Sequence, residues 1–323
     1  MTNHAMDITV IGCGRWGSLI TWYLDRIGHR VTLYGMADAP DMKRFLATRS
    51  NDLLTLPESV RLTTDIRDVD KSKVIIISIP SQALRGLMEE LRPLELCQKD
   101  VVLCMKGIEI SSGKRLSEIA REALDDSCRV AVWLGPGHVQ EFYKGNPSCM
   151  VIDSEDDSLK QTLVEAFSSD LIRFYYGQDL IGNEIGAAAK NVIGIAAGML
   201  DGYGLSTLKG ALMARGTHEV AMLIAAMGGN ERSAYGLCHL GDYEATVFSP
   251  HSHNRAFGEC FAKGEPFGAL AEGYYTCRAM MDLSKKHGVE LPICSAVYRI
   301  LYEGEDCKAA LMNLMTRSLK AEF

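Results

Sequence analysis

The segment ITVIGCGRWGSLITWYL, residues 8–24, constrains the fold of this chain more than any other. It places Gly12, Gly14 and Gly17 in a GxGxxG pattern between a β-rich run and a helical pattern, and a second β-rich run, RVTLY, follows. That βαβ context is the one in which the pattern binds dinucleotides. Gly12 permits a tight turn, Gly14 lets a pyrophosphate approach the backbone, and Gly17 allows close packing of helix and strand. We therefore expect a dinucleotide site here; the alternative is a tight turn with only a structural role.

The choice between NAD and NADP stays open. An acidic residue at the end of the second strand would favour NAD by accepting a hydrogen bond from the ribose 2′-hydroxyl, whereas a nearby arginine would favour NADP. The sequence there is LYGMAD, in which Asp38 comes late, and Arg15 lies in the glycine loop itself. The expected cofactor is therefore NAD or NADP.

Short apolar, β-rich runs recur through the first half of the chain, beginning at Ile8, Arg30, Val74, Val101, Val130, Ser148 and Leu171. Because the runs are continuous rather than alternating, we expect strands covered on both faces of a mainly parallel sheet. After about Asp179 the sequence changes to Ala, Gly, Leu and Met at helical spacing. We predict an α/β chain in which a Rossmann-type doubly wound sheet is followed by a mostly α-helical C-terminal domain. Residues 1–177 would bind the dinucleotide, and residues 178–323 would hold the substrate and the catalytic groups.

Lys190 stands out in the segment EIGAAAKNVIGIAAGML, residues 184–200, because it is the only charge after the opening glutamate. The small residues around it would let neighbouring backbones pack closely and remove the lysine partly from water. Desolvation disfavours an ammonium group and suits a lysine to proton transfer near neutral pH. The residues alone leave two interpretations, a catalytic lysine and an internal ion pair.

Composition excludes several classes of partner. The net charge of −7 argues against a broad nucleic-acid surface, which needs clustered positive charge. No apolar run approaches the roughly 20 residues that a membrane-spanning helix needs. The first residues, MTNHAMD, lack the basic region of a signal peptide. Ten cysteines without a CxxC pair indicate reduced thiols in a cytoplasmic protein.

Four further strings resemble the bacterial NAD(P)-dependent glycerol-3-phosphate dehydrogenases: MKGIE from Met105, LGPGHVQEFYKGNPS from Leu134, GNEIGAAAKNVIGIAAGMLDGYG from Gly182 and GLCHLGDYEATVFSPHSHNRAFG from Gly236. The resemblance extends from the glycine loop to ELPICSAVY near the C-terminus, and its pattern GxExGxxxKNxxxIxxG is far more specific than the glycine loop. It implies reduction of dihydroxyacetone phosphate to sn-glycerol 3-phosphate with NADH or NADPH. It also implies a homodimer that feeds glycerophospholipid synthesis.

The resemblance also implies three catalytic residues. Lys190 would protonate the alkoxide formed by hydride transfer and, in the reverse direction, take the hydroxyl proton. Asp242 would orient Lys190 and balance its charge, while Lys106 would polarise the substrate and contact the cofactor. Without the family, a lysine placed like Lys106 is more often a solvated loop residue, and the Gly-Asp pair that includes Asp242 is common in turns.

The implied binding residues form two sets. The substrate set comprises Lys106, Gly135, Gly137, Lys190, Asn191, Asp242, Thr246, Ser252, His253 and Asn254. The cofactor set comprises Gly12, Gly14, Arg15, Trp16, Gly17, Lys106, Val139, His253 and Glu272. No metal is expected, because His251 and His253 have no third ligand in an identifiable position.

The sequence departs from the family at the expected substrate pocket. His253 stands where the family has an arginine for the substrate phosphate, and a histidine is only partly charged at neutral pH. Arg255, two residues later, need not point the same way. Gly137 removes a hydroxyl group, and Val139 replaces an alanine beside His138.

These departures leave two other hypotheses. One is a dehydrogenase of the same fold that acts on a different 2-keto or 2-hydroxy substrate. The other is a non-catalytic NAD(P)-binding sensor, which the retained Lys106, Lys190 and Asp242 disfavour.

Overall fold

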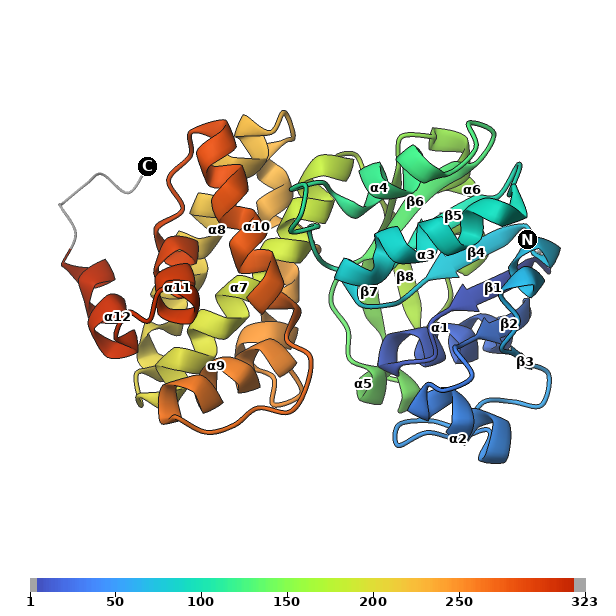
Figure 1. Ribbon diagram of the computed structural model, residues 1–323, viewed down its shortest axis with the longest axis horizontal. Helices are drawn as coiled ribbons and strands as arrows, with labels where there is room; N and C mark the ends of the chain where they lie inside the picture. The colour runs from blue at the N-terminus through green and yellow to red at the C-terminus, as the bar shows by residue number, and fades with distance from the viewer. Residues whose placement is uncertain (1–4, 317–323) are drawn as a thin grey trace. The chain divides into compact units, whose positions relative to one another are not determined.

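The computed structural model describes residues 5–316, which form two compact units (Figure 1). Unit 1 comprises the residues up to Lys106 together with Lys114–Leu180, and unit 2 comprises Gly107–Gly113 together with the residues from Ile181 onward. The excursion Gly107–Gly113 was not anticipated from the sequence. Its Ile108 is fully buried among the core residues of unit 2. The chain therefore contributes to unit 2 in two segments, the short Gly107–Gly113 and the long segment that begins at Ile181.

Unit 1 is built on one sheet of eight strands in the order β3-β2-β1-β4-β5-β6-β7-β8. The strands are β1 (Asp7–Ile11), β2 (Arg30–Tyr34), β3 (Arg61–Thr63), β4 (Val74–Ile77), β5 (Asp100–Leu103), β6 (Arg129–Leu134), β7 (Ser148–Ser154) and β8 (Ile172–Tyr176). Neighbouring strands are parallel except for β6 and β7. The order reverses between β1 and β4, as in a doubly wound sheet, so the Rossmann-type fold is confirmed. All seven expected strands are present, and β3 was missed because three residues give too short a pattern.

Helices cover both faces of this sheet: α1 (Arg15–Arg26), α2 (Pro40–Thr48), α3 (Leu84–Leu91), α4 (Leu116–Ala123), α5 (Val139–Tyr143) and α6 (Asp157–Phe167). On one face Val10 belongs to the same core cluster as Tyr23 of α1 and Phe167 of α6. Ile75 and Ile77 alternate to the other face and are also fully buried, and there α3 and α4 pack together. Burial on both faces explains why the strands read as continuous apolar runs.

Unit 2 is helical, as expected, with α7 (Leu180–Gly202), α8 (Lys209–Ala226), α9 (His253–Lys263), α10 (Glu272–His287), α11 (Pro292–Tyr302) and α12 (Cys307–Met315). Figure 1 shows α7 running among the other helices of this unit. Residues 182–200 are all buried, which explains why α7 has no polar face. Within residues 5–316, no helix combines the length and the apolar character needed to cross a membrane.

A row of glycines runs along α7 at every fourth residue and is interrupted by Lys190. We call Gly186, Gly194, Gly198 and Gly202 the glycine row. Residues spaced by four form the ridges and grooves through which helices pack, and without side chains the row is a groove. A Cβ on Gly194 would lie 2.6 Å from Cγ2 of Thr246, and one on Gly198 would lie 1.9 Å from the carbonyl oxygen of Arg255. The row therefore lets the segment 239–262 press against α7 on both sides of Lys190.

Gly198→Ala tests this packing. The added methyl group would force α7 and α9 apart, and such overpacking costs about 1–3 kcal/mol or more. That exceeds the gain of about 1 kcal/mol from alanine in a helix. The free energy of unfolding in urea should therefore fall. Gly210→Ala in α8 is the matched control, because its Cβ would meet nothing within 4 Å. Equal stability of the two variants would show that the close approach is unnecessary.

Candidate active site

The glycine loop joins β1 to α1 in unit 1. Gly12 has a φ of +110°, and a Cβ there would lie 2.1 Å from the carbonyl oxygen of Ser78. A Cβ on Gly17 would lie 1.9 Å from the carbonyl oxygen of Gly12. Packing thus requires glycine at both positions. At Gly14 a Cβ would meet nothing within 4 Å, so the fold itself does not require glycine there. A ligand that approaches the backbone would require it.

The loop ends at the start of α1, which suits an anion. Gly14 is the N-cap of α1, and the first turn carries no acidic residue. The amide groups of a helix N-terminus attract phosphate groups. Arg15 and Trp16 are the first two residues of the helix, and the Trp16 ring lies 6.1 Å from the Phe142 ring. These groups fit the pyrophosphate of a dinucleotide.

Lys106 and Gly135 lie together at the carboxyl ends of β5 and β6. Nζ of Lys106 donates a hydrogen bond of 2.7 Å to the carbonyl oxygen of Gly135. Gly135 has a φ of +124°, in the region that favours glycine. In doubly wound sheets this edge is where ligands bind. Two of the expected substrate residues are therefore adjacent in unit 1.

Lys190 forms a buried ion pair in unit 2. Its Nζ lies 3.0 Å from Oδ2 of Asp242 and donates a hydrogen bond of 2.7 Å to Oγ1 of Thr246. The side chains of Lys190 and Asp242 are only 9% and 1% exposed. The internal ion pair considered from the sequence is thus present, and it joins three of the expected site residues.

A second group of expected residues begins at Asn191, which directly follows Lys190. Asn254 donates from Nδ2 to Oδ1 of Asn191 over 3.0 Å, and its own Oδ1 accepts the amide of Gly273 at 2.8 Å. Ser252 caps α9 with its side chain, and Glu272 is the first residue of α10. Asn254 thereby ties α7 to the start of α10.

Comparison with known proteins decides the family. The N-terminal model of the NAD-dependent glycerol-3-phosphate dehydrogenases matches residues 7–160, and the C-terminal model matches residues 179–312. The chain belongs to this family. It is 38% identical to the NAD(P)+ glycerol-3-phosphate dehydrogenase of Prosthecochloris aestuarii over 98% of this chain and 100% of that one. The corresponding enzyme of a Bradyrhizobium species is 37% identical over the full length of both chains.

A solved structure agrees. The crystal structure of glycerol-3-phosphate dehydrogenase from Coxiella burnetii matches with a TM-score of 0.91 and 27% identity, over 97% of this chain and 99% of that one. The family expected from the sequence is confirmed, together with its dependence on NAD or NADP.

Packing requires glycine at position 137. A Cβ on Gly137 would lie 2.2 Å from Cε2 of Phe142, so the ring occupies the space of any side chain there. Phe142 is buried in the same core cluster as Val139, the first residue of α5. Gly137 thus leaves room for the Phe142 ring of α5.

Arg255, two residues after His253, is engaged by other residues of unit 2. Its Nη1 lies 2.6 Å from Oδ2 of Asp201 and 3.0 Å from Oε2 of Glu259, and its Nε donates to the carbonyl oxygen of Ser249. Burial alone would raise the pKa of Asp201, but hydrogen bonds from Lys209, Ser206 and Arg255 outweigh it and lower that pKa.

His253 is the first residue of α9, and it is half-buried. Its Nδ1 donates to the carbonyl oxygen of Leu270 at 3.2 Å. The His253 ring is thus held by the segment just before α10, whereas Arg255 forms an ion pair with Asp201.

His239, which is fully buried beside the ion pair, was not among the residues expected at the site. Its ring nitrogens lie 2.8 Å from the carbonyl oxygen of Gly186 and 2.8 Å from the hydroxyl of Tyr243. Burial lowers the pKa of His239 to about 4. The one signal in the sequence is its position three residues before Asp242 in HLGDY, a string that by itself indicates only a turn.

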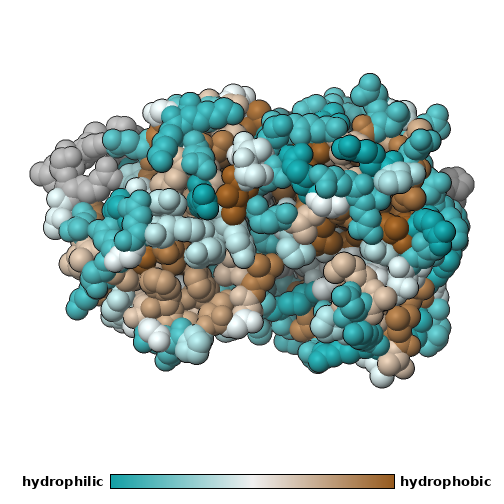
Figure 2. Space-filling model, in the orientation of Figure 1, coloured by the Kyte–Doolittle hydropathy of each residue, from teal (hydrophilic) through white to brown (hydrophobic). Residues whose placement is uncertain are grey.

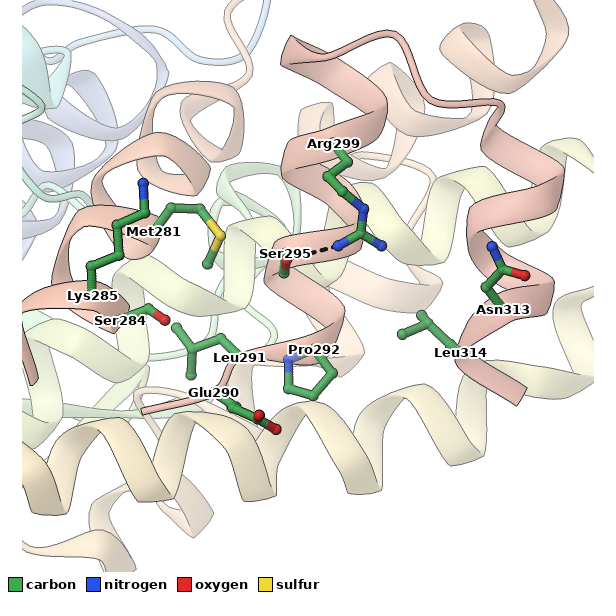
Figure 3. A pocket seen from close by; sticks show the side chains of 10 residues that line it. All are labelled: Met281, Ser284, Lys285, Glu290, Leu291, Pro292, Ser295, Arg299, Asn313 and Leu314. Carbon is green, nitrogen blue, oxygen red and sulfur yellow. Dashed lines mark hydrogen bonds between the residues drawn. The ribbon is translucent and has the colours of Figure 1, made fainter. Parts of the chain in front are cut away.

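A separate hollow of about 490 Å³ lies in unit 2 and contains none of the expected site residues (Figure 3). It is lined by Met281, Ser284, Lys285, Glu290, Leu291, Pro292, Ser295, Arg299, Asn313 and Leu314. Arg299 is occupied there by Ser295 and Glu305. Across residues 5–316, no group of three or more His, Cys, Asp or Glu side chains is arranged to hold a metal ion.

Gly14→Val tests the dinucleotide site. The protein should fold normally, because the φ of −71° and ψ of −169° suit valine and its Cβ meets no neighbour. Affinity for NADH and NADPH should fall roughly tenfold or more, a loss of about 1.4 kcal/mol per factor of ten. Calorimetric titration and thermal melting measure the two effects. Gly86→Ala on α3, also without a neighbour within 4 Å, should change neither. Unchanged affinity in Gly14→Val would place the dinucleotide elsewhere.

Proposed function

We propose that this protein reversibly reduces dihydroxyacetone phosphate to sn-glycerol 3-phosphate with NADH or NADPH, and that this reaction feeds glycerophospholipid synthesis. The observation that carries the proposal is the buried pair of Lys190 and Asp242 with Thr246 beside it. Removing two charges from water costs about as much as their attraction returns, so a buried pair adds little stability. A chemical role accounts better for its presence.

Lys190 is the proposed acid and base. The reduced nicotinamide supplies the hydride when it is bound, and the ketone oxygen then needs a proton. Lys190 donates that proton, and in the reverse direction its neutral form accepts one from the hydroxyl group. Burial disfavours the ammonium form of Lys190, and the Asp242 carboxylate 3.0 Å away favours it. Thr246 fixes the direction of the ammonium group.

The other expected residues take supporting roles in the proposal. Lys106, held by Gly135, polarises the substrate and contacts the cofactor. Asn191 and Asn254, with Ser252 and His253 at the start of α9, bind the substrate phosphate end. The cofactor is held by the glycine loop with Arg15 and Trp16, and by Val139, His253 and Glu272.

A homodimer in the cytoplasm completes the proposal. Figure 2 shows hydrophobic surface over the end of unit 2 that carries α9, and exposed apolar side chains of this part include Phe248 and Phe261. Contiguous apolar surface is common where subunits meet. All ten cysteines are free thiols, as suits a reducing compartment.

A second candidate is a dehydrogenase of the same fold with another 2-keto or 2-hydroxy substrate. Two observations favour it: His253 replaces the family arginine, and Arg255 is engaged with Asp201. A substrate with a smaller negative charge would tolerate this site better.

Lys190→Ala should lower kcat by about a hundredfold to ten-thousandfold, because it removes the general acid. The Kd for NADH should change little. Steady-state kinetics at 340 nm and a binding titration measure these quantities.

The alanine variant leaves the Asp242 carboxylate buried without its cation, which destabilises a protein by about 3–5 kcal/mol. The double variant Lys190→Met with Asp242→Asn removes both charges and preserves the packing. A near-normal kcat in either folded variant would disprove the role of Lys190.

His253→Arg tests the phosphate site. A histidine loses its charge as pH rises through about 6.5, whereas arginine stays charged and grips two oxygens. In the natural protein KM for dihydroxyacetone phosphate should therefore rise between pH 6 and 8.5. The arginine variant should show a lower and flatter KM. The second ionisation of phosphate, near pH 6, opposes the histidine effect and is corrected with a control ligand.

Unphosphorylated dihydroxyacetone is the comparison substrate. If the natural protein prefers neither ketone at any pH and the arginine variant gains nothing, the pocket does not bind phosphate. The second candidate function would then replace the first.

A further inference from the structure

His239 lies beside the Lys190–Asp242 ion pair and has no part in the reaction proposed above. It precedes the short helical turn Leu240–Asp242 and has no exposed surface. A buried histidine needs partners for both ring nitrogens, and His239 has them in Gly186 of α7 and Tyr243.

The partners determine which nitrogen carries the proton. The carbonyl oxygen of Gly186 can only accept, so Nδ1 of His239 is the donor across their 2.8 Å contact. Burial lowers the pKa of His239 to about 4, opposed by the Gly186 hydrogen bond and by Asp242, so the ring is neutral near pH 7. Nε2 of the neutral ring therefore accepts from the Tyr243 hydroxyl at 2.8 Å.

Together with backbone hydrogen bonds, these contacts connect His239 to both residues of the ion pair. In an α-helix the carbonyl of Gly186 also accepts the amide of Lys190, four residues later. The carbonyl of His239 accepts the amide of Asp242 at 3.0 Å. Oδ2 of Asp242 then meets Nζ of Lys190 at 3.0 Å. His239 thus adds a second bond, beside the ion pair itself, between the turn that carries Asp242 and the helix that carries Lys190.

Packing leaves the ring little freedom to move. A Cβ on Gly186 would lie only 3.0 Å from Cβ of His239, so the turn sits directly against α7. Tyr243 is also fully buried, and a Cβ on Gly216 of α8 would lie 3.2 Å from its hydroxyl oxygen. The charged groups that act on the His239 ring are Asp242 and Lys190.

We propose that His239 is a positioning residue of the proton-transfer site: its neutral ring holds the turn of Asp242 at a fixed level along α7, so that the Asp242 carboxylate meets the Lys190 ammonium. The inference rests on the proposed role of Lys190. His239 acts through Asp242 and does not itself exchange a proton with the substrate.

Two variants of His239 separate this role from mere space-filling. The amide nitrogen of His239→Asn can take the place of Nδ1 and keep the bond to Gly186. The longer His239→Gln places its amide near Nε2 and gives up that bond. The glutamine variant should lose roughly tenfold to a hundredfold in kcat, since a displacement of about 1 Å can cost that much. The asparagine variant should stay within about threefold, and KM for NADH should not change in either.

The dependence of kcat on pH distinguishes positioning of Asp242 from a purely structural role of His239, because a structural role would not change it. With Asp242 displaced, the ammonium form of Lys190 loses its support, so the alkaline limb of kcat for ketone reduction should shift to lower pH in His239→Gln. It should stay in place in His239→Asn. Asp306→Ala, which removes the side-chain cap of α12, is the stability control. It should lower Tm but leave kcat and its pH profile unchanged.

Lys190→Ala separates the possible failures. If that variant keeps kcat, the proposed function fails. If it loses kcat while His239→Gln behaves like the natural protein, only the positioning role is overturned. Equal losses in the asparagine and glutamine variants, with no shift of the alkaline limb, would also overturn it, because His239 would then serve only to fill space.

Discussion

The ion pair between Lys190 and Asp242 is the interaction on which the arrangement of unit 2 depends. Two opposite charges out of water need each other at short range, because either one alone would be costly. The chain meets this requirement by placing Lys190 in the middle of a helix that is otherwise apolar and by bringing a turn from far along the sequence against it. The glycine row makes that approach sterically feasible. The small residues of α7 thus provide the close approach that the buried lysine needs in order to meet its carboxylate.

A second charged cluster supports the same segment from its other end. Asp201, near the end of α7, bonds both Lys209 and Arg255, while Lys209 also donates to the carbonyl of Val247. Arg255 donates to the carbonyl of Ser249. The chain between Thr246 and α9 is thereby held through its backbone carbonyl groups. Arg255, two residues after His253, is held by this cluster through Asp201 and the carbonyl of Ser249.

The fold was largely predictable, because its signals are local. Continuous apolar runs correspond to strands buried on both faces, and β3 was missed because it is too short to show a pattern. Within the site, the residue types came from the resemblance, but the contacts did not. Nothing in the spacing shows that Phe142 fills the space beside Gly137, or that His239 reaches Gly186. Those facts depend on which residues meet after folding. Gly14 differs from Gly12 and Gly17 only in its surroundings in the folded chain, where packing requires glycine at Gly12 and Gly17 but not at Gly14.

The excursion Gly107–Gly113 bears on the modularity of this architecture. Ile108 is part of the core of unit 2, although it is encoded within the stretch that otherwise builds the sheet. A gene fragment that began at Ile181 would encode all the long helices of unit 2 but not this side chain, and an empty isoleucine site in a core costs about 2–5 kcal/mol. Recombination at the apparent boundary would therefore yield an incomplete module. A single crossover at that boundary therefore cannot transfer unit 2 with its complete core.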